Sequence, residues 1–423
     1  MRAAYFPVML LGLASTAFGT LIFNDPVVDP SNFRLTQFTN SPIGTAYSLQ
    51  RLPDGSVAVL EGGTIQRLTD LNSDGIADDV GTPIYHSNGA FLTGFVKVGD
   101  LYAVGDYNSS SITLLKPGAT PADPMTAVGS INFNYAVDWY HPTAGLSARP
   151  TPGSPGSYDL VFNVGSQYND QLSTDQVPLT GLVNASVDGD SIYKITINET
   201  GPTPTLSGLQ KVATGIRNVA GMQFATNGDF YFADNAIDGP GADGDEPPQA
   251  DELNRILLAD FGATLPDFGY PTCYIGYRSG SQVGTNCVDP YLAFQPIDNG
   301  TLLGLESEGP VEMAFAPSNF PAGFNNGIFI GFAGKSSTGP SNEENAVVYY
   351  DFGTGKYIHF TESGLPGVGR PVGLLSTSDA LYISDLNTGI VYEITAAVPE
   401  PSSLVLTFGA LTLLFASRKK LRP

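Results

Sequence analysis

The densest group of oxygen ligands in the sequence lies on a loop rich in Gly and Pro near the middle of the chain. Between residues 235 and 252 this loop carries the acidic residues Asp238, Asp243, Asp245, Glu246, Asp251 and Glu252. Carboxylates gathered on a loop are ligands for hard cations, and Ca²⁺ suits such a loop best. We therefore expect a calcium site formed by Asp238, Asp243, Asp245, Asp251 and Glu252.

An arginine and an amide, Arg217 and Asn218, precede a pattern of alternating apolar residues just before this loop. A guanidinium presents five donors in a planar fork that matches anionic groups, and loops at strand starts are common places for binding residues. The pair predicts an anion site. The alternative is a surface loop with a structural arginine.

A second acidic stretch spaces Asp70, Asn72 and Asp74 at every second residue and continues with Gly75. This is how an EF-hand-type calcium loop begins, but the acidic residue expected at its twelfth position is replaced by Gly81. The stretch therefore predicts either a peripheral calcium loop or a plain Asp-Gly turn.

Candidates for a general base in the neutral pH range are few, because the chain has only 3 histidines. His141 is the strongest of them, and the alternative is a histidine that merely packs at the edge of the fold. His86 is expected at the surface, and His359 on the solvent side of an alternating strand. The 2 cysteines, Cys273 and Cys287, predict a disulfide in an oxidising compartment, or else two buried thiols.

Short hairpins must position these residues, because no long amphipathic pattern predicts a helix. Strand and turn signals recur at residues 52–61, 99–104, 158–164, 228–234, 326–332 and 378–385. The stretch 221–234 is typical of them, with two apolar strands joined by an Asn-Gly turn. Six such hairpins predict one all-β domain, a six-bladed β-propeller.

Composition agrees with a large β domain and excludes one class of partner. The chain has 49 Gly and 32 Pro for turns, and 24 Phe and 20 Tyr for strands. Its net charge of −22 is opposite in sign to the basic surface that nucleic acid requires.

Both ends of the chain predict export. Residues 1–19 combine Arg2, an apolar run and small residues, as in a secretory signal peptide. Residues 398–423 contain the sequence VPEP, an apolar segment over 403–417 and a basic cluster, and this tail resembles a PEP-CTERM sorting signal. That resemblance implies export across the inner membrane of a Gram-negative bacterium and removal of the tail by an exosortase. A simple membrane anchor is the alternative.

The region between the ends, residues 20–397, resembles a known family. GIRNVAGMQF (215–224) and DELNRI (251–256) are similar to motifs of the glucose/sorbosone dehydrogenases. These are six-bladed propellers that bind pyrroloquinoline quinone (PQQ) and calcium and oxidise sugars. The resemblance implies that His141 takes a proton from the sugar and that Arg217, Asn218, Lys335 and Arg370 hold PQQ.

Two positions depart from the family pattern. Ser166 stands where the family often has an aspartate that orients the histidine, and Ser87 where it has Gln or Glu. Both changes point toward weaker catalysis. The expectation is an exported PQQ- and calcium-dependent sugar dehydrogenase. The alternatives are a propeller that has lost the chemistry and acts as an extracellular binding or matrix protein, or a metal-dependent hydrolase such as a lactonase.

Overall fold

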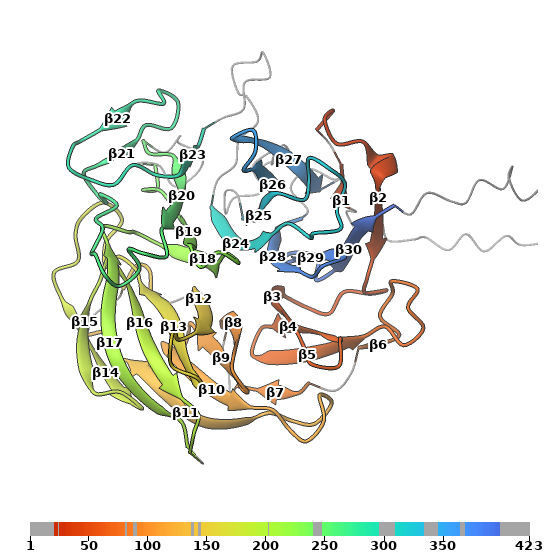
Figure 1. The fold of residues 1–423 in the computed structure, drawn as a ribbon, viewed down its shortest axis with the longest axis horizontal. Coiled ribbons are helices and arrows are strands. Elements are labelled where there is room, and N and C mark those ends of the chain that lie inside the picture. The colour runs from red at the N-terminus through yellow and green to blue at the C-terminus, as the bar shows by residue number, and fades with distance from the viewer. Residues whose placement is uncertain are drawn as a thin grey trace, which may run out of the picture.

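The computed structural model describes residues 21–23, 25–80, 83–87, 91–136, 139–142, 145–201, 203–239, 248–295, 309–333, 346–363 and 369–397. Within these ranges the regular structure consists of strands and one short 3₁₀ turn, η1 (Pro30–Asn32). The strands form six sheets of four or more strands around a common axis (Figure 1). The prediction of an all-β, six-bladed propeller is confirmed.

Blades one to three follow the chain from its N-terminal side, and each begins with the strand nearest the axis. Blade one contains β3 (Ala46–Arg51), β4 (Val57–Glu61), β5 (Thr64–Thr69), β6 (Asp79–Val80) and β7 (Tyr85–His86). Blade two contains β8 (Leu92–Val98), β9 (Leu101–Asp106), β10 (Ser111–Lys116) and β11 (Thr126–Phe133), with β14 (Gln176–Gly181) and β15 (Ala185–Asp188) added at its outer edge. Blade three contains β12 (Leu146–Pro150), β13 (Ser157–Val164), β16 (Ser191–Asn198) and β17 (Thr205–Thr214).

Blades four to six complete the ring. Blade four contains β18 (Val219–Phe224), β19 (Phe230–Asp234), β20 (Asp251–Ile256) and β23 (Leu292–Phe294). Blade five contains β24 (Pro310–Phe315), β25 (Gly327–Phe332), β26 (Ala346–Asp351), β27 (Lys356–Ser363) and β1 (Leu21–Ile22). Blade six contains β28 (Pro371–Ser376), β29 (Ala380–Asp385), β30 (Val391–Ala396) and β2 (Phe33–Gln37). A separate ribbon pairs β21 (Tyr274–Ile275) with β22 (Gln282–Val283).

The ring is closed by strands from opposite ends of the domain. β2 pairs antiparallel with β30, from Phe33 opposite Ala396 to Gln37 opposite Tyr392. The neighbouring innermost strands contact one another all the way around, in the order β3, β8, β12, β18, β24, β28 and back to β3. The fold therefore depends on a strand pairing between residues more than three hundred positions apart.

Local sequence explains the hairpin at the centre of the chain. Gly228 adopts a positive φ of 89° in the turn between β18 and β19, and the Asn227 side chain accepts a hydrogen bond from the Asp229 amide (3.0 Å). Glycine takes this left-handed conformation at little cost, which is why the Asn-Gly pair sets the turn. The predicted hairpin over residues 221–234 is confirmed.

The hydrophobic core is divided among the contacts between blades. Among the described residues, six clusters of buried side chains occur, one between each pair of neighbouring blades. The second strands β9, β25 and β29 are buried at every position. Strands that are covered on both faces have continuous runs of apolar residues, and for this reason these strands can be recognised in the sequence.

Small residues allow the innermost strands to approach the axis closely. The third residues of β3, β8, β18 and β28 are Ser48, Gly94, Gly221 and Gly373. A Cβ atom at Gly221 would clash with the Val311 carbonyl oxygen of the next blade. The third residue of β24 is instead Glu312, so one long acidic side chain stands among small ones.

The predicted export signals lie outside the described residues. The signal peptide (1–19) and the sorting signal (398–423), with its apolar segment 403–417, therefore remain predictions. Within the described ranges, no helix is long and apolar enough to cross a membrane.

Candidate active site at the upper face

Predicted site residues from three blades lie at one end of the propeller. His141 precedes β12, Arg217 and Asn218 precede β18, and Arg370 precedes β28. The six first strands occupy equivalent places in sheets of the same topology, so they run in one direction and residues just before them gather at one end. We call the end at which the first strands begin the upper face.

Arg217 is the most buried of these side chains, with 1% of its surface exposed. Its Nε donates to the Asn169 carbonyl oxygen (3.0 Å), and its Nη2 donates to Asn169 Oδ1 (2.6 Å) and Asp238 Oδ2 (2.7 Å). A longer contact joins Nη1 to the Asn235 carbonyl oxygen (3.5 Å). Protein oxygens thus accept hydrogen bonds from most of the Arg217 N–H groups, which the sequence analysis predicted to bind an anion.

Tyr140 joins this network from the blade-three side. Its hydroxyl donates to Asp238 Oδ2 (2.7 Å), and the Arg217 guanidinium lies 5.6 Å from the centre of its ring. The Tyr140 ring also packs edge-on against the His141 imidazole, with the ring centres 4.6 Å apart. Tyr140 and Asp238 therefore link the predicted base to the predicted anion site.

His141 is held by its backbone and keeps a free ring nitrogen. Its amide donates to the Ser166 carbonyl oxygen (2.9 Å), and the Ser166 amide donates to the Arg217 carbonyl oxygen (2.8 Å). His141 Nε2 is buried and forms no hydrogen bond within the described structure. Burial, reinforced by the Arg217 charge, lowers the pKa of His141 to about 3. The imidazole is therefore neutral at physiological pH and can accept a proton.

Asp234, at the end of β19, is a buried carboxylate that orients the Arg217-Asn218 pair. It accepts hydrogen bonds from the Arg217 amide (3.0 Å) and the Asn218 amide (2.7 Å). Burial raises the pKa of Asp234 to about 7, although these hydrogen bonds and the Arg217 charge act in the opposite direction. The carboxylate thus sets the backbone at the start of β18.

The structure places Asp251 and Glu252 on strand β20, whereas the sequence assigned them to the acidic loop. Asp251 Oδ1 accepts from the Ala236 amide (2.6 Å) and Oδ2 from the Gly309 amide (2.7 Å). Glu252 is buried, and its Oε2 accepts a hydrogen bond from Asn254 Nδ2 (3.3 Å). Burial raises the pKa of Asp251 to about 6 and that of Glu252 to about 8.

The remaining members of the predicted calcium set are only partly described. Asp238 bonds Arg217 and Tyr140 through Oδ2, and 56% of its side chain is exposed. Asp243 and Asp245 lie outside the described residues. The part of the chain that the structure covers contains no group of three or more His, Cys, Asp or Glu side chains arranged to hold a metal.

Of the other two predicted PQQ ligands, the structure describes only Arg370. Arg370 is partly buried, and its amide donates to Asp385 Oδ1 (3.1 Å), which repeats the contact between Arg217 and Asp234. Burial lowers the pKa of Arg370. Lys335 lies outside the described residues. Arg370 and Asn218 are both partly exposed at the upper face.

The other two histidines lie away from this network. His86 is exposed on β7, as predicted. The expectation for His359 is wrong, because it is fully buried and its Nδ1 lies 2.8 Å from Glu362 Oε1. A bulge at this point of β27 shifts the register, so His359, Phe360 and Thr361 are all buried. Ser87 donates to Asp106 Oδ2 (3.0 Å).

The stretch around Asp70 is held together by its own hydrogen bonds. Asp70 accepts from the Ser73 amide (2.7 Å) and the Gly75 amide (2.9 Å), and Asn72 Oδ1 accepts from the Asp74 amide (2.9 Å). These contacts define the Asp-Gly turn, and the peripheral calcium loop stays a prediction.

The two cysteines are joined in a disulfide near the loop that supports Asn169. Cys273 and Cys287 have Cα atoms 6.3 Å apart. Close to this bridge, the hydroxyl of the buried Tyr270 lies within hydrogen-bond distance of the carbonyl oxygens of Tyr168 (2.8 Å) and Gln171 (2.9 Å) and can donate its one proton to either. Tyr270, three residues before Cys273, thus contacts the loop that binds the Arg217 guanidinium.

Three residues of this network have no role in the sequence-based prediction. Asn169, Tyr140 and Asp234 hold Arg217 or connect it to His141. A repeated acidic residue at the end of second strands, as in Asp106, Asp234 and Asp385, is a signal that could have identified Asp234. Asn169 carries no such signal, because its contact with Arg217 spans 48 residues.

No family model matches the chain, and no curated protein matches it. Solved structures do match its fold. The calcium structure of a Trichoderma reesei carbohydrate-active enzyme of family AA12 covers 90% of this chain and 98% of its own, with 17% identity and a TM-score of 0.62. The holo PQQ domain of Coprinopsis cinerea pyranose dehydrogenase covers 89% and 97%, with 14% identity and a TM-score of 0.58.

A bacterial structure is similar over nearly the same length. The PQQ-bound aldose sugar dehydrogenase of Streptomyces coelicolor covers 88% of this chain and 100% of its own, with 14% identity and a TM-score of 0.51. At this identity the likeness establishes the shared propeller fold, and function must be argued from the site.

Proposed function

We propose that the protein is an exported, PQQ- and calcium-dependent sugar dehydrogenase with His141 as its proton acceptor. The observation that carries this proposal is the neutral His141 imidazole, whose Nε2 is unpartnered at the upper face beside Arg217. The sugar dehydrogenases with the same fold support it. A buried polar atom without a partner is unusual in a folded protein and suggests a ligand group.

Other residues of the upper face fit the cofactor in part. Arg370 and Asn218 would hold its carboxylates, whereas Arg217 would do so only by releasing Asp238. When bound, PQQ supplies an acceptor for the two electrons that leave the sugar as hydride. The hydroxyl proton of the same sugar carbon would pass to His141 Nε2, so that C–OH becomes C=O. We derive no step through calcium, because the described carboxylates form no metal site.

The base is expected to be weak. A full negative charge close to the imidazole would stabilise its protonated form. The nearby Asp238 carboxylate is instead paired with Arg217, and residue 166 is a serine. Loss of such a carboxylate partner can lower the rate by several orders of magnitude. We therefore expect slow turnover compared with an enzyme that has an aspartate at this position.

The full chain, loaded with PQQ and Ca²⁺, tests the proposal. Quinone absorbance would report binding, and dye reduction across a panel of aldoses would report turnover. His141→Ala should retain binding and lose turnover, whereas His86→Ala, a change at the exposed histidine, should behave as wild type. Equal turnover in both variants would contradict the role of His141, and absence of PQQ binding would contradict the proposal as a whole.

A second candidate is a propeller that binds extracellular polysaccharide without redox chemistry. The specific observation in its favour is that Asn169, Asp238 and Asn235 occupy the Arg217 donors. A chain with this function would fail to bind PQQ and would be retained by polysaccharide in affinity electrophoresis. The lactonase alternative would show calcium-dependent ester hydrolysis without any quinone.

We further propose that residues 1–19 direct export and that an exosortase removes the tail from residue 398 onward. The disulfide between Cys273 and Cys287 supports an oxidising compartment. Mass spectrometry of the protein from its native host would test this. A mature chain starting near residue 20 and lacking the apolar tail is expected, and an intact N-terminus in the cytoplasmic fraction would contradict export.

A further inference from the structure

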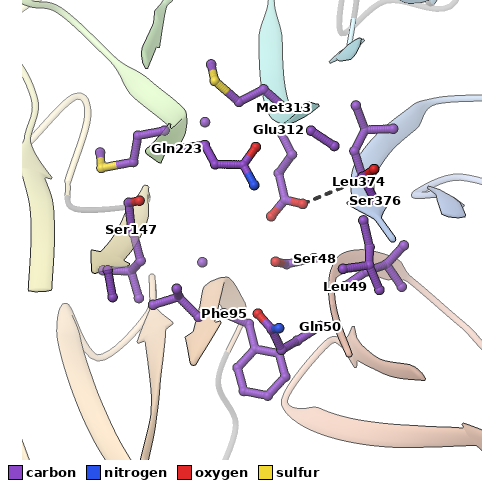
Figure 2. A pocket seen from close by; sticks show the side chains of 18 of the residues that line it. Ser48, Leu49, Gln50, Phe95, Ser147, Gln223, Glu312, Met313, Leu374 and Ser376 are labelled. Atoms are coloured by element: carbon purple, nitrogen blue, oxygen red, sulfur yellow. Dashed lines mark hydrogen bonds between the residues drawn. The ribbon is translucent and has the colours of Figure 1, made fainter. Parts of the chain in front are cut away.

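A cavity of about 340 Å³ lies on the propeller axis, and its lining includes none of the residues to which the proposed function assigns a role. All six innermost strands line it, and Figure 2 shows side chains from several blades turned toward the same space. Its walls include the carboxylate of Glu312, the amide of Gln223 and the hydroxyls of Ser48 and Ser147. Oxygen-bearing side chains from four blades therefore meet at the axis.

Glu312 brings a carboxyl group into this cavity without a basic side chain to pair with it. Its Oε2 accepts a hydrogen bond from the Leu374 amide of the next blade (3.2 Å), and the Ser48 hydroxyl also donates to the carboxylate. Among the described residues, no Lys, Arg or His forms an ion pair with it. Arg51 lines the same cavity, but its guanidinium lies near Gly55 and Tyr382.

An uncompensated carboxylate in this position has a physical cost. Burial raises the pKa of Glu312 to about 7, because a charge removed from water is unfavourable unless a partner replaces the solvent. The nearby Glu312 charge also contributes, after burial, to a raised pKa of Tyr47. A bound cation would remove the penalty by supplying the missing opposite charge.

A second, independent observation is an unpartnered amide oxygen on a side chain that lines the same cavity. Gln223 Oε1 is buried and has no hydrogen-bond partner in the described structure. Figure 2 shows the Gln223 amide near the Glu312 carboxylate with its nitrogen turned toward that group, so a half-turn of the amide would present Oε1 to a cation there. Carboxylate, amide and hydroxyl oxygens are the ligands of hard cations, and the cavity has room for waters to complete the coordination.

We propose that the axial cavity is a binding site for a hydrated hard metal cation, held by Glu312, Gln223 and Ser48. Glu312 is its only charged ligand, so the cation is bound weakly by comparison with sites built from several carboxylates. Contact with residues from three blades would let the cation stabilise the closed ring. This site does not depend on the sugar dehydrogenase activity or on the acidic loop of the upper face.

Thermal unfolding of the full chain in choline buffer, after dialysis against a chelator, tests the proposal. NaCl, KCl, MgCl₂ and CaCl₂ are added separately, with choline chloride as the control for ionic strength, and bound metal is counted after gel filtration. Glu312→Gln removes the charge with almost no change in shape. Glu61→Gln, at a partly buried glutamate on β4, is the matched control.

At least one cation should raise the unfolding temperature of wild type and Glu61→Gln in a saturable way. Glu312→Gln should lose a bound cation and weaken this response by about tenfold or more, since a charged ligand is removed. Calcium held by the acidic loop would act equally on all three proteins, so only the difference between them counts.

The proposal is overturned if wild type shows no response beyond that to choline chloride, or if Glu312→Gln responds as wild type does. Should Glu312→Gln fail to fold, Gln223→Met provides the second test, because it keeps the charge and removes the unpartnered oxygen. A cation response in Gln223→Met equal to that of wild type would then contradict the assigned ligands.

Discussion

Replacing Arg217 by methionine tests whether this arginine fastens the loops of the upper face. The change keeps an unbranched side chain of similar length and removes the guanidinium. Three hydrogen bonds of 2.6 to 3.0 Å are lost, two to Asn169 and one to Asp238. Hydrogen bonds to charged groups contribute about 1.5–3 kcal/mol each.

The free energy of unfolding should fall by less than the sum of these contributions, because 56% of the Asp238 side chain is exposed and water can solvate its carboxylate. Breaking a buried ion pair costs about 3–5 kcal/mol. We expect the free energy of unfolding to fall by about 3–4 kcal/mol. Water cannot replace the donor as easily at Asn169, so most of the loss arises there.

The loss should also depend on pH. The Arg217 charge lowers the pKa values of Asp234 and Asp251, which burial raises to about 7 and about 6. Without that charge both rise further, so the folded state holds its protons to higher pH than the unfolded chain. Stability is then lost more steeply as pH increases, and the destabilisation is larger at pH 8 than at pH 5.

Urea unfolding at the two pH values measures both effects, with Arg278→Met as the control at an exposed arginine. The control should change the free energy of unfolding by no more than about 0.5 kcal/mol. An Arg217→Met protein as stable as the control would refute the role of Arg217 as a fastener. Arg217→Lys should be intermediate, because an ammonium group cannot form the forked contacts.

Three further changes test other parts of the fold. Glu312 has a folded pKa of about 7 against an ordinary value of 4.5, so its contribution to stability is present below pH 4.5 and lost as pH rises through 7. Urea unfolding in cation-free buffer measures this effect. Between pH 4.5 and 8 the free energy of unfolding of wild type should fall by up to about 3 kcal/mol more than that of Glu312→Gln. Parallel pH profiles of the two proteins would contradict this. Gly221→Ala should lower the free energy of unfolding by about 2 kcal/mol or more, because the new Cβ meets the Val311 carbonyl oxygen. The control Gly201→Ala, where the nearest atom lies 3.5 Å from the new Cβ, should be nearly neutral. Equal melting temperatures of the two variants would contradict close packing at the axis. Asp251→Asn should destabilise by about 2 kcal/mol, because an amide can accept from only one of the Ala236 and Gly309 amides through its oxygen, and its NH₂ group would face the other. Proteolysis should then begin near residue 309, and an unchanged cleavage pattern would argue against that anchor.

The sequence by itself determined the repeating unit of this protein. Turn residues such as Asn227-Gly228 act on their immediate neighbours, and the apolar runs that follow become second strands buried on both faces. Six such units imply a ring, because each sheet needs a neighbour on either side to cover it. The positions of Arg217, Asn218 and Arg370 just before first strands could likewise be recognised.

Only the tertiary structure decided what these side chains contact. Arg217 binds Asn169 and Asp238, at 48 and 21 residues' separation, and Glu312 accepts a hydrogen bond from Leu374, 62 residues away in the next blade. A bulge turned His359 into the core. Such contacts depend on the spacing and register of whole blades, which are set by packing around the ring, whereas a local pattern reports only the turn and the strand in which a residue lies.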